Sequence, residues 1–435
     1  MIELERKLPR AIPLFAASFF WIACGGGGNS PTGPITISST GTITPSASIP
    51  GLSLYEDIGI ELPADKDVLF VTAKAQSAAT IAIGTVTAPT GLIYFDVSNE
   101  TGLEGVRPGG AAPSALGLFL PSTDRVNGTL LGPGRYPFDF FSNANVPIDI
   151  EVYAYQALAE NATGLINLNV HLGVSTGISA AEAPNNQAMT EFLTKIDDLL
   201  QPGDLALRRV RFFDVANAAY DDLELQTGEY FTLFSTATDS EQNDLDLFLI
   251  DGFLDNGIPT GVVGISGGIP GPYHAAGFPT AGVAIAWSAI TNVYDPLFAG
   301  VIAAHELGHY LGLFHTTESF SPGEVDENGD PITLGPRDYD PIEDTVECAP
   351  GDGQSTSAGN CVNQGTQYVM FWLPQGGATE FSPSQQAVMH RNPHVLADDT
   401  VRWSSAVQAH VHRTQARRYS PDYLMNHRML CGNSR

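Results

Sequence analysis

Residues 305–315 read HELGHYLGLFH, and this string constrains the fold more than any other part of the chain. Within it, His305, Glu306, His309, Gly312 and His315 stand at the spacing H-E-x-x-H-x-x-G-x-x-H. Residues four apart lie on one face of a helix, so His305 and His309 point in the same direction. Gly312 can adopt a positive φ at no steric cost, which ends the helix and lets His315 return. The fold must therefore arrange a helix, a turn and a returning residue around one point.

Three neutral imidazoles around one point are a ligand set for zinc, which bonds histidine nitrogen at about 2.0–2.1 Å. Three protein ligands leave a fourth position for water, as in catalytic zinc sites. The metal lowers the pKa of that water to about 7, and a neighbouring carboxylate can take its proton and pass it to a leaving amine. The string predicts His305, His309 and His315 as zinc ligands and Glu306 as general base and acid. An amphipathic helix with incidental histidines is the alternative, and it explains neither the glycine nor the third histidine.

The sequence before the string predicts where its helix begins. Asp295 can cap the helix and Pro296 suits the first helical position. The apolar residues that follow recur at helical spacing and are Leu297, Phe298, Val301, Ile302 and Leu311. This pattern predicts a buried helix.

The string resembles the active-site motif of the metzincin zinc endopeptidases. In that family a methionine-containing turn lies beneath the zinc, and Met370 within Tyr368–Trp372 is the matching residue. Ordinary core packing is the alternative role for this methionine. Thr316 and the stretch from Asp344 to Cys348 look most like the pappalysin-like (cytophagalysin) branch, although residues 342–346 depart from its pattern.

The resemblance implies an α+β zincin catalytic domain, which we place at residues 161–395. The expected elements are strands at 166–171, 207–215 and 245–250, a helix at 186–200, and a helix from Ser382 to about Arg391. Residues 281–287 form a further apolar strand just before the active helix. In metzincins the corresponding edge strand pairs with extended substrate, whereas a plain core strand is the alternative.

Residues 51–160 predict a separate all-β, sandwich-like domain. Short alternating runs at 68–72, 92–95 and 148–153 are broken by Gly, Pro and Asn turns. We find no catalytic constellation there. The domain could bind a glycan, dock a partner, act as a spacer or shield the active site.

The N-terminus predicts export. Residues 1–23 carry a basic start and a short apolar run, which is typical of a signal peptide. Cys24 at its end resembles the lipidated cysteine of a bacterial lipoprotein, and residues 24–50 suit a flexible linker. The alternative is an ordinary secretory signal cut near residues 25–30. The mature chain is expected in the bacterial cell envelope, at the outer membrane or cell surface, or secreted, with the lipid as its one membrane contact.

The charge excludes some partners. The chain has 20 basic and 48 acidic residues, a net charge of −28, which repels nucleic acid and anionic lipid. The expected partner is a protein or peptide substrate, and the oligomeric state stays open.

Four cysteines occur. An oxidising compartment favours a Cys348–Cys361 disulfide, which would add about 3 kcal/mol of stability in the chain-entropy model. Two free thiols are the alternative. Cys431 has no evident partner.

Several other residues are weaker candidates. Asp326, Asn328 and Asp330 alternate as calcium ligands do. A second acidic group, Asp239, Asp244 and Asp246, is a similar weak candidate. Pro331 stands where an EF-hand loop has glycine, so a solvated acidic loop is favoured over Ca²⁺ there. His171 and His274 lack ligand spacing and are expected to be structural or exposed. Residues 396–435 form a basic tail predicted to be disordered, with a partner-binding arm as the alternative.

Two other functions fit the sequence. The chain could be an envelope binding or structural lipoprotein whose zinc site is not catalytic, although such a site has no use for Glu306. It could also be a zinc hydrolase that acts on cell-wall peptide. The predicted function is an exported zinc-dependent endopeptidase.

Overall fold

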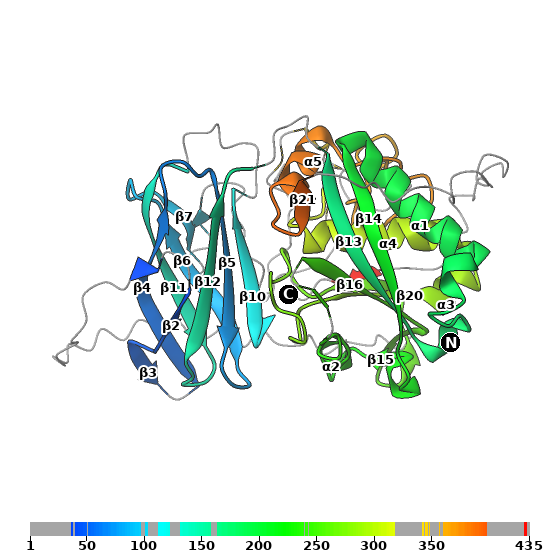
Figure 1. The fold of residues 1–435 in the computed structure, drawn as a ribbon, viewed down its shortest axis with the longest axis horizontal. Coiled ribbons are helices and arrows are strands. Elements are labelled where there is room, and N and C mark those ends of the chain that lie inside the picture. The colour runs from blue at the N-terminus through cyan, green and yellow to red at the C-terminus, as the bar shows by residue number, and fades with distance from the viewer. Residues whose placement is uncertain are drawn as a thin grey trace, which may run out of the picture.

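The computed structural model describes residues 36–37, 40–49, 51–96, 101–102, 112–121, 131–157, 163–238, 240–241, 243–317, 342, 344–346, 348, 356, 360–397 and 430–432. Two units rich in strands lie side by side (Figure 1). Several predicted features lie outside the described residues: the signal segment 1–23, the lipidation site Cys24, Asp239, and the group Asp326, Asn328 and Asp330.

The first unit consists of two sheets packed face to face. One sheet has the order β1 (Thr36–Ile37), β4 (Leu52–Leu62), β11 (Gly134–Ser142), β6 (Thr80–Thr87), β7 (Ile93–Asp96) and β8 (Thr101–Gly102), with β3 (Ala47–Ile49) beside β4 and β9 (Ala112–Pro113) beside β6. The other has the order β10 (Ala115–Leu120), β5 (Val68–Ala75), β12 (Ile148–Tyr155) and β2 (Thr40–Ile43). Alternate residues along the strands point inward, as Tyr136, Phe138 and Phe140 of β11 do, and form one core.

The predicted linker 24–50 is wrong at its C-terminal end. Residues 40–43 form β2, which pairs antiparallel with β12, and residues 47–49 form β3, which pairs with β4. Ile43 is fully buried in the core of the first unit. The Thr and Ile residues of this segment favour the β conformation, so the segment can add strands to the two sheets.

The second unit is built on one mixed sheet. Its strand order is β14 (Leu205–Asp214), β13 (Gly164–Leu172), β16 (Asp244–Ile250), β20 (Val283–Ala286), β19 (Val262–Ser266) and β22 (Leu430–Gly432), with β21 (Val395–Ala397) beside β13. The first four strands are parallel, and β19 runs antiparallel to β20. Residues 281–287 therefore contain an interior strand, and the core-strand interpretation holds because β19 covers its outer edge.

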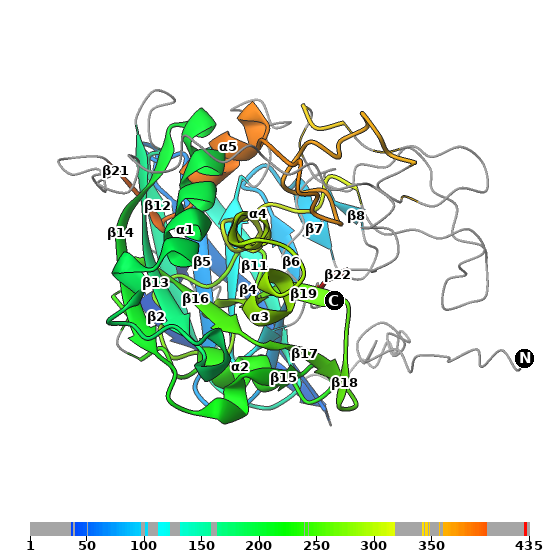
Figure 2. The same cartoon turned by 90° about the vertical axis from the view of Figure 1, so that its right-hand side faces the viewer.

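Helices cover one face of this sheet. α1 (Gln187–Leu200) and α4 (Pro296–Tyr310) share a hydrophobic core with the inward-facing residues of β13, and Figure 2 shows both helices in front of the sheet. The remaining elements are α2 (Glu229–Phe234), α3 (Trp287–Thr291), α5 (Pro383–His390), short 3₁₀ turns at Val174–Thr176, Ala183–Asn185, Gln201–Gly203 and Ala218–Tyr220, and a small sheet of β15 (Asp222–Glu224), β17 (Gly252–Asp255) and β18 (Ile258–Pro259). α2 lies against the other face of the large sheet, where Phe234 packs on Phe248.

The two units are joined by a packed interface. Val68, Phe70 and Phe119 of the first unit belong to the same buried cluster as α1 and α4. Thr72 donates a hydrogen bond to the carbonyl of Tyr273 at 3.1 Å across the same interface. The first unit is thus part of the support of the second.

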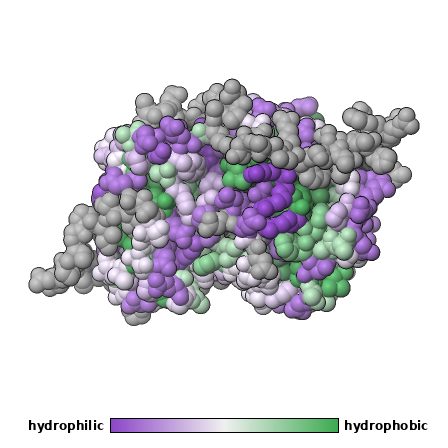
Figure 3. Space-filling model, viewed as in Figure 1, coloured by the Kyte–Doolittle hydropathy of each residue, from purple (hydrophilic) through white to green (hydrophobic). Residues whose placement is uncertain are grey.

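The expectation of a disordered tail at 396–435 is wrong at residues 396–397, which belong to β21, and at residues 430–432, which form β22. In the described part of the chain, no helix is long and apolar enough to cross a membrane. On the face shown in Figure 3, hydrophilic residues gather near the centre and lie beside smaller apolar patches.

Candidate metal centre

Helix α4 carries the first two histidines of the motif. The Oδ1 atom of Asp295 accepts a hydrogen bond from the backbone N–H of Phe298 at 2.9 Å, and Pro296 occupies the first helical position, as predicted. The helix ends at Tyr310, and Gly312 takes a φ of +109°. This left-handed value is easy for glycine alone, so the glycine turns the chain back toward the helix.

The structure brings the three predicted ligands together. Nε2 of His315 lies 3.1 Å from Nε2 of His305 and 3.1 Å from Nε2 of His309. All three side chains are buried. Their ligand nitrogens lie close enough together to hold one metal ion.

Backbone carbonyls orient two of the imidazoles. Nδ1 of His305 donates to the carbonyl oxygen of Val369 at 2.6 Å, and Nδ1 of His309 donates to that of Leu313 at 2.7 Å. A neutral imidazole carries one proton, so each Nε2 is left with a lone pair that faces the cluster. Burial, followed by the neighbouring histidines, holds the pKa of His305 well below its usual range, which favours the neutral ligand form.

This donor set fits zinc. Lone pairs on nitrogen atoms 3.1 Å apart repel one another unless a metal ion or a proton lies between them. Nitrogen ligands of a tetrahedral zinc ion stand about 3.3 Å apart when each bond is about 2.0–2.1 Å long. The carbonyl acceptors behind His305 and His309 are the kind of partner that fixes metal-binding histidines.

Glu306 is buried next to His305 on α4. An ideal Cβ built on Gly264 of β19 would stand 2.5 Å from Oε1 of Glu306. The carboxylate therefore lies against the backbone of β19, in space that a glycine leaves open.

Met370 lies beneath the helix. Its side chain is fully buried, and its carbonyl oxygen accepts a hydrogen bond from the backbone N–H of Thr316 at 2.9 Å. An ideal Cβ on Gly308 would stand 2.5 Å from the sulfur of Met370. The segment around Met370 thus contacts both the helix and the residue after His315.

The loop between His315 and Met370 is held at two described points. Cys348 and Cys361 form the predicted disulfide. The carboxylate of Asp344 accepts a hydrogen bond from the hydroxyl of Ser382 at 2.5 Å and another from the backbone N–H of Ser384 at 2.9 Å. Asp344 therefore ties this loop to the start of α5, where Ser382 caps the helix as predicted.

Asp244 and Asp246, which the sequence offered as a weak candidate for calcium, have partners within the protein. Arg209 and Arg211 both form ion pairs with Asp244. Asp246 accepts a hydrogen bond from the ring of His171 at 2.7 Å. A carboxylate already neutralised by two guanidinium groups is a poor cation ligand.

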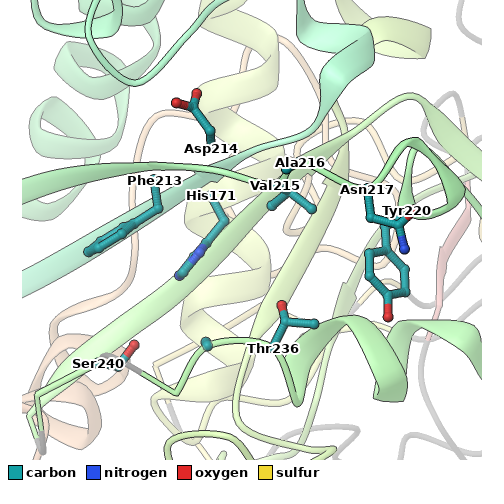
Figure 4. A pocket seen from close by; sticks show the side chains of 10 residues that line it. His171, Phe213, Asp214, Val215, Ala216, Asn217, Tyr220, Thr236 and Ser240 are labelled. Carbon is teal, nitrogen blue, oxygen red and sulfur yellow. The ribbon is translucent and has the colours of Figure 1, made fainter.

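His171 and His274 have structural surroundings. The ring of His171 stacks between Phe213 and Phe248 and lines a cavity of about 300 Å³ (Figure 4). This cavity lies on the face of the sheet opposite α4, because His171 alternates along β13 with buried residues that contact the helices. The ring of His274 contacts Tyr153 at the interface between the units.

The sequence did not indicate several residues that shape the centre. Gly264, Gly308, Leu313 and Val369 act through backbone carbonyls or through a missing side chain. A hydrogen bond to a carbonyl needs no particular residue type, so it leaves no pattern in the sequence.

No family model matches the chain, and no curated protein matches it. Among solved structures 96 chains match, and one is the crystal structure of metalloproteinase-II from Bacteroides fragilis. It is 16% identical, with a TM-score of 0.24, over 36% of this chain and 45% of its own. A weak structural neighbour is a metalloproteinase. This chain spans less than half the length of that neighbour.

Proposed function

We propose that the protein is a zinc-dependent endopeptidase. The observation that carries the proposal is the cluster of His305, His309 and His315, in which Nε2 of His315 lies 3.1 Å from Nε2 of each of the other two, with Glu306 buried beside it. A zinc ion held by these nitrogens would lower the pKa of a bound water to about 7 and polarise a peptide carbonyl.

The residues of the chain would supply the rest of the chemistry. Glu306 would take a proton from the attacking water and give it to the nitrogen of the leaving amine. Val369 and Leu313 would keep two ligands in the tautomer that presents Nε2 to the metal. Water would then attack the carbonyl carbon directly and the C–N bond would break as the amine leaves, without a covalent intermediate on the protein.

The test compares three purified chains. The wild type is expected to bind one zinc ion and to cleave casein or gelatin, and a chelator should stop the cleavage. Glu306→Gln should keep the zinc and lose most of the cleavage, whereas His309→Ala should lose both. Full activity of zinc-loaded Glu306→Gln would refute the role of Glu306, and absence of zinc from the wild type would refute the metal centre.

The leading alternative is a binding or structural protein with a zinc site that is not catalytic. Glu306 favours the enzyme, because a structural site is usually closed by a fourth protein ligand and has no need of a buried carboxylate beside it. A wild-type chain that holds zinc but cleaves no member of a broad peptide library, cell-wall peptides included, would favour this alternative.

We further propose that the enzyme is of metzincin type, in the pappalysin-like branch, with Met370 as the turn methionine. Neither assignment changes the proposed chemistry.

We also propose that the chain is exported as a lipoprotein anchored at Cys24. The Cys348–Cys361 disulfide supports an oxidising compartment. Mass spectrometry of the mature N-terminus from a bacterial host would test the anchor, because an unmodified N-terminus would exclude it.

A further inference from the structure

A segment from the far end of the chain lies along the sheet that flanks the metal centre. The backbone of β22 pairs parallel with β19, and Leu430, Cys431 and Gly432 stand opposite Val262, Gly264 and Ile265, respectively. On its other side β19 pairs with β20. β22 therefore occupies the outer edge of this sheet.

The paired position lies next to the proposed general base. Gly264 is the residue of β19 that contacts Glu306, and Cys431 is its partner across the strands. Neighbouring strands lie about 4.8 Å apart, so the backbone at residue 431 runs one strand spacing beyond the glycine that borders the carboxylate.

The edge of a strand is a template for an extended peptide. Its free N–H and C=O groups can pair with the backbone of any chain that approaches in β conformation. A peptide that is to be hydrolysed beside Glu306 could use this edge of β19. The same edge is taken by β22, so the two strands would compete for it.

The charge of the tail favours this contact. Residues 398–435 contain six Arg and three Asp and have neither Lys nor Glu, whereas the whole chain carries a net charge of −28. A basic segment is attracted to the acidic remainder of its own chain. Covalent connection also gives a tethered segment an effective concentration of about mM, so that a short pairing can suffice.

We infer that residues 430–432 are an intramolecular competitor of the substrate, which pairs with β19 beside Glu306 and reduces cleavage. The inference rests on the proposed endopeptidase function. It concerns the backbone of the segment, and the side chain of Cys431 has no part in it.

Two full-length variants test the inference. Leu430→Pro/Cys431→Pro removes the backbone N–H groups of both residues. Successive N–H groups of a strand point to opposite sides, so one of the two removed groups is the one that faces β19. Leu430→Val/Cys431→Ser is the matched control, because it keeps both donors. With zinc-loaded chains and a fluorogenic peptide, we expect a several-fold rise in kcat/KM for the proline variant and none for the control.

Hydrogen exchange supplies a readout that does not depend on activity. Amides within residues 262–266 should exchange faster in the proline variant than in the control. A synthetic peptide of residues 426–435 should inhibit the proline variant competitively when it is added at about mM concentration.

The outcomes separate the two proposals. Equal kcat/KM for the two variants, whether raised or unchanged, would overturn the competitor role and leave the endopeptidase function standing. Unchanged exchange at β19 would likewise overturn it. Absence of cleavage by the wild type and by both variants would overturn the endopeptidase function, and the competitor role would fall with it.

Discussion

Phe119 of β10 lies against Gly312 in the turn of the metal centre: an ideal Cβ on this glycine would stand 3.3 Å from Cδ1 of the phenyl ring. Phe119 is buried and also lies near Phe70 of β5, with ring centroids 6.2 Å apart. The turn that returns His315 to the cluster is therefore supported by the first unit. This contact gives the first unit a role in shaping the centre, a role that its own sequence does not indicate.

The contact predicts that Phe119→Ala weakens both the fold and the metal site. Loss of a buried phenyl ring lowers the free energy of unfolding by about 3–5 kcal/mol and leaves a cavity. That cavity would lie beside Gly312. Urea unfolding and zinc titration would measure the two effects. Phe138→Ala is the control, since Phe138 is fully buried in the first unit's own core. It should lower the unfolding free energy by a similar amount and leave zinc affinity unchanged; an equal loss of affinity in both variants would contradict the prediction.

Gly264→Ala should lower activity without removing the metal. The new methyl group would stand 2.5 Å from Oε1 of Glu306, so the carboxylate or the strand must move. Moving a catalytic group by about 1 Å can lower the reaction rate by about 100-fold. Gly377→Ala is the matched control, because an ideal Cβ on Gly377 meets nothing within 4 Å. Zinc content and kcat/KM, measured for both variants, test this, and unchanged kcat/KM in Gly264→Ala would refute the close approach.

Loss of the disulfide should lower the free energy of unfolding. Cys348 and Cys361 are 13 residues apart, and closing a loop of about this size stabilises a chain by about 3 kcal/mol in the chain-entropy model. The double variant Cys348→Ala/Cys361→Ala should unfold at lower urea and should no longer respond to reductant. Cys431→Ser should keep the wild-type response to reductant. A wild type that unfolds identically with and without reductant would argue against this stabilisation.

His394 should make stability depend on pH. Its ring is buried against Tyr273 and Tyr310, and burial lowers its pKa to about 4. The unfolded chain binds a proton near the ordinary pKa of about 6.5, so the unfolded state gains protons first as pH falls. The free energy of unfolding should therefore decrease between about pH 6.5 and pH 4, by up to about 3 kcal/mol.

The measurement compares wild type with His394→Gln by urea unfolding at several pH values. A chelator is added so that release of metal by protons does not contribute. The variant should show a shallower dependence on pH in this range. Identical slopes in the two chains would show that His394 does not titrate as stated.

Much of the second unit could be predicted from periodicity. The helix at 187–200 and the strands β13, β14 and β16 agree with the expected positions to within a few residues, because each has a clear apolar face. The capping residues Asp295 and Ser382 were likewise readable, since capping depends on residues adjacent in sequence. The strands at 40–43 and 430–432 were not predicted, because they form only by pairing with strands that are distant in sequence.

By itself, the sequence determined which side chains form the candidate centre. The spacing of His305, His309 and His315, with Gly312 before the last of them, follows from a helix and its turn, and it predicts both the histidine cluster and the neighbouring carboxylate. Local geometry follows from local sequence, so this part could be read without a fold.

The tertiary structure alone decided what surrounds those residues. The carbonyl of Val369 behind His305, the backbone of Gly264 at Glu306, the ring of Phe119 at Gly312 and the strand β22 at the sheet edge all come from distant segments. These contacts use backbone groups or close packing, which many sequences can provide. They are fixed by the way in which the two units and their strands come together.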